Sequence, residues 1–416
     1  MKKIIYFLIG LLPVIIFSQD NSDWKKGSFT ITPEILVGYT APSNIYFPEM
    51  GLQKQFILSL GRNHNNNPQE WAQRYDGPET GVSFGISDFG NLDSLGIAIT
   101  VMPYVGFKSF GSNRFTTNIG LGASYFNKKY DPITNPNNRA VTTDVTWAFR
   151  AYLHYNFLKT KRIDLRLGLG YSHHSNGHTK LDNQGYNSFL LGLSAAIHAA
   201  ENEPIENESS ALQFKKSAYH YWSLRYGQGL NALGYAFNKN KPVYTVEFEY
   251  GKVYNNNFKI GVGVFYRLYQ HYYDYIQQNE SLVQDGREFA SFKENPFYNA
   301  SNLAVYVNGE FFLNHFGIDL KLGYNIFKPG YKIDRRINAG WFQTPQEIPE
   351  NWVLGKFNSK YKFKQAINIR MGLRYYLIGT SEKPKQNIFI GAHLNANMGQ
   401  ADFTEFSIGY VQSFGF

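Results

Sequence analysis

The chain has 416 residues, a formal net charge of +9 at pH 7, 17% aromatic residues, 38 glycines and no cysteine. The absence of cysteine excludes disulfides and thiolate-bound metals. The basic charge is dispersed along the chain, so we do not expect nucleic acid as a partner. Many aromatic and glycine residues together with a negative mean hydropathy indicate a protein whose apolar side chains form an outer skin instead of an inner core.

The first eighteen residues, MKKIIYFLIGLLPVIIFS, have the pattern of a secretory signal peptide. Lys2 and Lys3 precede an apolar run that ends at Ser18, and cleavage is expected before Gln19. The run is short for a spanning helix, and no cysteine follows it to accept a lipid. We therefore predict a signal peptide at 1–18 and an exported mature chain, 19–416, with a charge of +7.

Apolar and polar residues alternate with a period of two in many segments, as in FTEFSIGYVQSFGF at the C-terminus. About ten residues of apolar-out, polar-in alternation are typical of a transmembrane β-strand. The segments are 28–39, 53–62, 80–88, 94–104, 114–126, 145–157, 163–173, 186–197, 216–227, 242–253, 257–269, 301–313, 316–325, 361–377, 386–396 and 402–416. A soluble sandwich would also alternate, but the signal peptide and the repetition favour a membrane protein.

The fold predicted for 19–416 is therefore an all-β, transmembrane antiparallel β-barrel of about sixteen strands in the outer membrane. In such a barrel both termini lie in the periplasm, and the periplasmic connections are short. Two connections, 63–79 and 198–215, fall on the periplasmic side and yet are long. Fourteen strands therefore remain an alternative.

The segment YSHHSNGHTK at 171–180 contains three of the ten histidines. In the preceding strand the odd positions are apolar and are expected to face lipid, so His173 and Ser175 share that outer face. His174 points the other way. The next strand has its apolar series on odd positions as well, and this series begins with Asn187. Polar side chains that face acyl chains are costly and require an explanation.

A histidine and a serine two residues apart on a strand have neighbouring side chains, so His173 could accept the proton of Ser175. Asn176 and the backbone N–H groups around Gly177 are candidate donors for an oxyanion. These groups fit nucleophilic ester cleavage, although a polar loop exposed to solvent would look similar.

Metal binding is the competing interpretation of the histidines in this segment. His173, His174 and His178 would need a further ligand, and only Asp182 lies close enough in sequence to supply one. Adjacent histidines on a strand diverge. We therefore expect no metal and no other cofactor.

Several segments resemble the outer-membrane lipid A 3-O-deacylase, or acyloxyacyl hydrolase-like, family. They are WAQRYDGPETG at 71–81, DFGN at 88–91, KKYDPITNPNNRA at 128–140, GLGYSHHSNG at 168–177 and NQGYN at 183–187. The resemblance implies a barrel that hydrolyses an ester-linked acyl chain of lipid A in the outer leaflet without a cofactor. It also implies that His173 is the base, Ser175 the nucleophile and Asn176 an oxyanion-hole residue.

Asn187 departs from the family, which carries a glutamate at about this place to orient the histidine. An amide oxygen can accept the imidazole N–H, but it cannot stabilise imidazolium as a carboxylate does. The resemblance therefore leaves three alternatives: slow turnover with Asn187, a charge supplied by Asp182, or an inactive enzyme.

The acidic stretch ENEPIENESS divides the chain into a deacylase-like half, 28–198, and a second half, 216–416. A weak echo of the first site occurs at His393 and Asn395. His393 is expected to point inward and to have no serine partner, so we predict no second active site. The second half is expected to be structural or to line a lumen.

The alternative to an esterase is a non-catalytic barrel, either porin-like or structural, since about sixteen strands can enclose an aqueous lumen. For the esterase the expected partner is lipid A or lipopolysaccharide. Lys128, Lys129 and Lys180 lie in loops expected outside the cell, where they would meet lipid A phosphates or simply form a solvated rim. A homodimer is a further option that the sequence leaves open.

Overall fold

The computed structural model describes residues 28–199, 214–234, 236–338 and 357–416, and the predicted signal peptide lies outside these ranges. The described ranges contain sixteen strands, as predicted, and the alternative of fourteen is wrong. The first eight strands are β1 (Phe29–Ala41), β2 (Gln53–Asn63), β3 (Glu79–Asp88), β4 (Ile97–Ser109), β5 (Ser112–Phe126), β6 (Val145–Lys159), β7 (Ile163–Ser175) and β8 (Tyr186–His198). The others are β9 (Ala218–Asn231), β10 (Lys241–Tyr254), β11 (Phe258–Tyr269), β12 (Ser301–Leu313), β13 (Phe316–Phe327), β14 (Ile367–Tyr376), β15 (Gln386–Asn397) and β16 (Gln400–Phe414).

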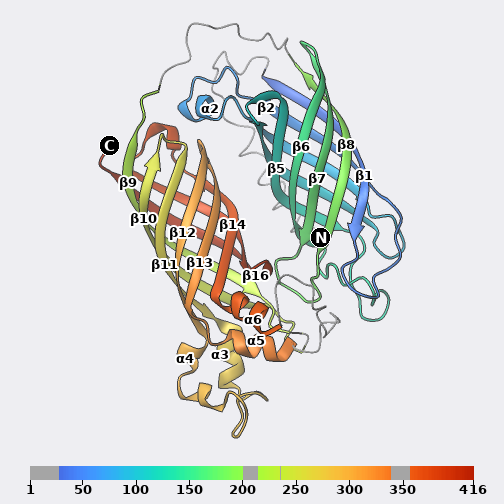
Figure 1. Cartoon of the computed structure of the whole chain (residues 1–416). Coiled ribbons are helices and arrows are strands. Elements are labelled where there is room, and N and C mark those ends of the chain that lie inside the picture. The colour runs from blue at the N-terminus through green and yellow to red at the C-terminus, as the bar shows by residue number, and fades with distance from the viewer. Residues whose placement is uncertain (1–27, 200–213, 235, 339–356) are drawn as a thin grey trace.

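The strands close into two barrels of eight strands each, so the prediction of a single barrel is wrong. β8 pairs back with β1, with Phe189 opposite Tyr39. β16 pairs with β9, with Ile408 opposite Tyr226. Figure 1 shows the first barrel (β1–β8) beside the second barrel (β9–β16). The long connection from 198 to 215 is thus the link between two barrels, and most of it, 200–213, lies outside the described residues.

Both barrels carry apolar side chains on the outside and polar ones on the inside. Exposed outer residues of the first barrel include Leu167, Leu169, Phe189, Leu191 and Leu193, and those of the second include Val262, Leu322, Ile390, Phe406 and Ile408. This distribution is the reverse of a soluble protein and is typical of a barrel surrounded by lipid. Among the described residues, no helix has the length and apolar character needed to cross a membrane.

A buried carboxylate on β1 binds two basic side chains inside the first barrel. Glu34 on β1 contacts Arg150 and lies 2.9 Å, Oε1 to Nε2, from His154. The inward face of β6 carries Arg150, Tyr152, His154 and Asn156, which are all buried.

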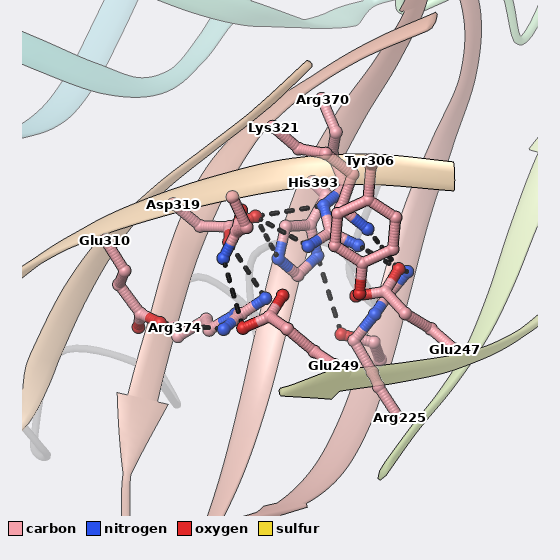
Figure 2. Close-up of polar contacts among 12 residues, drawn as sticks. Arg225, Glu247, Glu249, Tyr306, Glu310, Asp319, Lys321, Arg370, Arg374 and His393 are labelled. Carbon is pink, nitrogen blue, oxygen red and sulfur yellow. Dashed lines mark hydrogen bonds and ion pairs between the residues drawn. The ribbon is translucent and has the colours of Figure 1, made fainter. Parts of the chain in front are cut away.

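The interior of the second barrel contains a dense network of buried ion pairs (Figure 2). Glu247 accepts hydrogen bonds from Arg225 at 3.1 Å, from Arg370 at 2.9 Å and from Lys321. Asp319 lies 2.9 Å from Arg370 and 2.8 Å from Arg374. Eight strands leave an interior just wide enough for side chains to fill, so the wide lumen of a single sixteen-stranded barrel does not form.

Short helices lie at the ends of the barrels. α2 (Glu70–Arg74) lies between β2 and β3 in the first barrel. At one end of the second barrel are α3 (Gln270–Gln277), the 3₁₀-helix η2 (Ala290–Glu294), α4 (Pro296–Asn299), α5 (Tyr331–Asn338) and α6 (Phe357–Ala366), while η3 (Thr380–Glu382) lies between β14 and β15 (Figure 1). The strand predicted from 361 is wrong in its first six residues, because α6 continues to Ala366.

Candidate active site

The ladder between β7 and β8 places His173 directly opposite Asn187. The Nδ1 atom of His173 lies 2.8 Å from Oδ1 of Asn187, and the Tyr171 hydroxyl donates to the same oxygen at 2.6 Å. Because an amide oxygen only accepts, Nδ1 carries the hydrogen and the lone pair is on Nε2. The imidazole is therefore held in the tautomer that a general base requires.

Ser175 is the last residue of β7 and lies beside the loop 176–185, which we call the serine loop. Its Oγ accepts hydrogen bonds from Nδ2 of Asn183 at 2.8 Å and from the backbone N–H of Gly177 at 3.2 Å. Backbone donors around Gly177 were expected, whereas sequence reasoning missed Asn183. Among the described residues, no hydrogen bond joins His173 to Ser175.

Asn176 holds the serine loop together. Its Nδ2 donates to the carbonyl of Lys180 at 2.7 Å, and its backbone N–H donates to Oδ1 of Asn183 at 2.8 Å. The amide N–H of Asn176 is thus engaged within the loop, and an oxyanion role for this residue stays a prediction.

Asp182 points toward Arg139 and not toward His173. Its Oδ2 lies 3.5 Å from Nε of Arg139, and its carbonyl accepts a hydrogen bond from Thr142. Burial raises the pKa of Asp182 to about 6, with Arg139 partly opposing the shift. Of the two candidates for orienting His173, Asn187 is therefore the one that contacts it.

The other two histidines of the segment 171–180, His174 and His178, make contacts that indicate a structural role. His174 points inward, as predicted, and packs edge-on against Phe126 and Phe89, at ring-centroid distances of 5.4 Å and 6.0 Å. His178 lies in the serine loop with φ of 65°, and its carbonyl accepts a hydrogen bond from Ala232 of the second barrel at 2.9 Å. No cluster of metal-binding side chains occurs in the described part of the chain.

The surroundings of Ser175 differ from the open, lipid-facing position that the strand pattern predicts. Only 4% of Ser175 is exposed. The indole of Trp147, its cross-strand neighbour, donates to Oγ1 of Thr404 on the second barrel at 2.9 Å. A Cβ atom built on Gly177 would collide with Thr404 and lie 3.0 Å from Cδ1 of Leu394. The second barrel therefore covers part of the surface next to Ser175.

A serine, a histidine and an aspartate also meet inside the second barrel. His393 points inward, as predicted, but the expectation that it has no serine partner is wrong, because Oγ of Ser407 lies 3.4 Å from Nδ1. Nε2 of His393 lies 3.5 Å from Asp319, whose carboxylate is already paired with two arginines. His393 and Asp319 are fully buried, so this array belongs to the ion-pair network of the barrel interior.

Residues 54–196 match the family model described as lipid A 3-O-deacylase (PagL). The first barrel is therefore PagL-like. The matched range begins in β2, ends in β8 and contains His173, Ser175, Asn176 and Asn187. No curated protein matches the chain.

Solved structures with a low sequence identity to this chain include the following three. The crystal structure of the outer membrane enzyme PagL is 15% identical with a TM-score of 0.29, over 39% of this chain and 97% of that one. A de novo designed transmembrane β-barrel is 12% identical with a TM-score of 0.23, over 40% and 95%. OccK5 from Pseudomonas aeruginosa is 10% identical with a TM-score of 0.20, over 93% and 97%.

Proposed function

We propose that this protein is an outer-membrane serine esterase that hydrolyses an ester-linked acyl chain of lipid A. The observation that carries the proposal is the His173–Asn187 pair, which lies on the same strand pair as Ser175 within the region that matches the PagL family. The apolar outer surface of the first barrel supports a substrate that stays in the membrane, because a lipid can reach such a surface by lateral diffusion.

In the proposed reaction, Oγ of Ser175 attacks the acyl carbonyl while Nε2 of His173 takes the hydroxyl proton. The tetrahedral intermediate collapses, and the sugar oxygen leaves with the proton from His173. Water, deprotonated by the same histidine, then attacks the acyl-serine ester. His173 returns this proton to Oγ of Ser175 as the fatty acid leaves. His173 must turn or shift slightly to reach Ser175, since apo geometry is often looser than that of a substrate complex.

The N–H of Gly177 and the side chain of Asn183 are the best-supported donors for the developing oxyanion. Both already donate to Oγ of Ser175, within hydrogen-bond distance of the atom that forms the new bond. Donors preorganised at this position stabilise the negative charge that grows on the carbonyl oxygen. In this proposal Asn176 contributes by fixing Asn183.

Ser175→Ala is the decisive substitution for the proposal. We expect lipid A from cells that express the wild-type chain to lose an acyl chain, and lipid A from cells that express Ser175→Ala to keep it. Mass spectrometry of extracted lipid A measures the difference, and Ser172→Ala, which removes a buried hydroxyl from the same strand, is the matched control. Identical acylation in wild type and Ser175→Ala would support the non-catalytic structural alternative.

A further inference from the structure

The two barrels contact each other at the serine loop. The side chain of Asn238, between β9 and β10, accepts the N–H of Leu181 at 2.8 Å and donates to the Leu181 carbonyl at 2.7 Å. The N–H of Ala232 donates to the carbonyl of His178 at 2.9 Å. Three hydrogen bonds from one connection of the second barrel therefore fix two residues of the loop that also contains Asn176 and Asn183.

The contact continues from the loop to the strand that bears the candidate nucleophile. Trp147 is paired with Ser175 across the β6–β7 ladder, and its indole N–H bonds to Thr404. Thr404 and Leu394 lie on the outer faces of β16 and β15, and both lie beside Gly177. Next to Ser175, the outer surface of the second barrel therefore occupies the place that lipid would take around an isolated first barrel.

The covered region ends abruptly below this point. Phe406, two residues from Thr404 on the same outer face, is 60% exposed, and on the first barrel Leu169, on the same outer face of β7 as His173, is 59% exposed. Exposed apolar surface therefore begins two residues from Thr404 on the second barrel and lies farther down the outer face of β7 on the first barrel.

We propose that the second barrel completes the candidate active site of the first. Leu394 and Thr404 form the wall beside Ser175 against which the acyl chain of the substrate lies, and Asn238 is a positioning residue that holds the serine loop. This inference rests on the proposed function and gives the second barrel a part in substrate selection. A fixed apolar wall discriminates between chains by their length and branching, because each methylene in such a pocket changes binding about tenfold or more.

The test uses the full-length protein in vesicles that contain lipid A molecules with ester-linked chains of different length, and mass spectrometry of the released fatty acids. Leu394→Ala is expected to shift the preferred chain toward longer or bulkier acyl groups, and Leu394→Phe toward shorter ones. Leu322, an exposed outer leucine on β13, provides the matched controls Leu322→Ala and Leu322→Phe. These controls should keep the wild-type profile.

Asn238→Ala tests the hold on the serine loop. Since small misplacements of reacting groups are costly, kcat should fall roughly tenfold or more with KM nearly unchanged. Asn238→Asp keeps the acceptor for the Leu181 N–H and should recover part of the rate. Circular dichroism and resistance to SDS at room temperature confirm that each variant is folded.

The outcomes separate the two proposals. An inactive wild-type protein, or a Ser175→Ala variant with wild-type activity, contradicts the proposed function itself. An active wild type whose Leu394 variants keep the same chain-length profile, or whose Asn238→Ala variant keeps its kcat, overturns the role of the second barrel and leaves the proposed function standing.

Discussion

At the scale of single residues, the candidate site differs from a serine triad in its neutral orienting group. Asn187 accepts the Nδ1–H of His173 and the hydroxyl of Tyr171, so two donors already converge on one oxygen. A carboxylate at this position would receive the same two hydrogen bonds and would also stabilise imidazolium in the transition state. The hydrogen bonds at position 187 would therefore suit a carboxylate, but the amide of Asn187 carries no negative charge.

Asn187→Glu should increase the rate of deacylation. Replacing the triad carboxylate by an amide costs about 10⁴ in rate in serine proteases, so we expect a gain of roughly 10²-fold or more in kcat from the reverse change. The initial rate of fatty acid release measures it. Asn187→Gln has the same length without the charge and is expected to show no gain, and equal rates in the two variants would contradict an electrostatic role.

The sequence reveals site residues that lie on the strands, but not those that lie in a loop or on the other barrel. His173, Ser175 and Asn187 follow from alternation on two adjacent strands, because a period of two determines the face of every residue. Asn183 lies in a loop without periodicity, so its bond to Ser175 needs the folded loop to be seen. The contact of Trp147 with Thr404 joins residues of different barrels, and no local pattern reports it.

At the scale of elements, the serine loop contains a carboxylate whose burial is unfavourable. The pKa of Asp182 rises from 3.8 to about 6 in the folded loop. A raised carboxyl pKa means that the folded loop binds the proton more tightly than the unfolded loop does. The contribution of protonated Asp182 to the stability of the loop is therefore fully present below pH 3.8 and is lost as the pH rises through about 6.

Hydrogen exchange at the amides of the serine loop can measure this effect. After correction for intrinsic exchange rates, the wild-type loop should be better protected at about pH 5 than at about pH 8. Asp182→Asn removes the titrating group, and the difference should disappear. The same pH dependence in both proteins would contradict the assignment to Asp182.

The ion-pair network of the second barrel is the other element with a measurable consequence. Glu247 compensates Arg225, Lys321 and Arg370, all of them buried. Glu247→Gln leaves this positive charge partly uncompensated and should reduce the free energy of unfolding by about 3 kcal/mol or more. Unfolding of the vesicle-embedded protein by urea measures this free energy.

The control for this prediction is Glu288→Gln. Glu288 makes an ion pair with Arg336 in which both side chains are about half exposed, so its loss should cost less than about 1 kcal/mol. Similar losses for the two variants would show that the buried network contributes no more than a surface pair.

Sequence patterns predict the strands well and their closure poorly. Nearly every predicted segment coincides with an observed strand, since alternation shows which residues face lipid. Alternation does not show whether β8 pairs with β9 or returns to β1, because both partners present the same apolar outer face. The pairing is decided by backbone hydrogen bonds along whole edges, such as Val37 with Leu191 and Ile35 with Leu193.

At the scale of the whole molecule, two filled barrels should not conduct ions as a single wide barrel would. Side chains occupy both interiors, and apolar residues that include Val283, Phe292 and Ile333 are buried among the helices that cover one end of the second barrel. We expect the purified protein to produce no stepwise conductance in planar bilayers, at concentrations where a general porin gives clear steps. Regular ohmic steps would contradict the filled interiors.

The pairing of β8 with β1 also affects how the chain is assembled into a membrane. An unclosed barrel exposes unpaired strand edges, which are prone to aggregation. In a single barrel of sixteen strands these edges would stay open until Phe414 was in place. Here β1 and β8 pair with each other, so the open strand edges of residues 29–198 are closed within the first half of the chain. The two barrels can therefore close one after the other during assembly. Each closure has a lower contact order than that of a single sixteen-stranded barrel, and the second begins beside a barrel that is already closed.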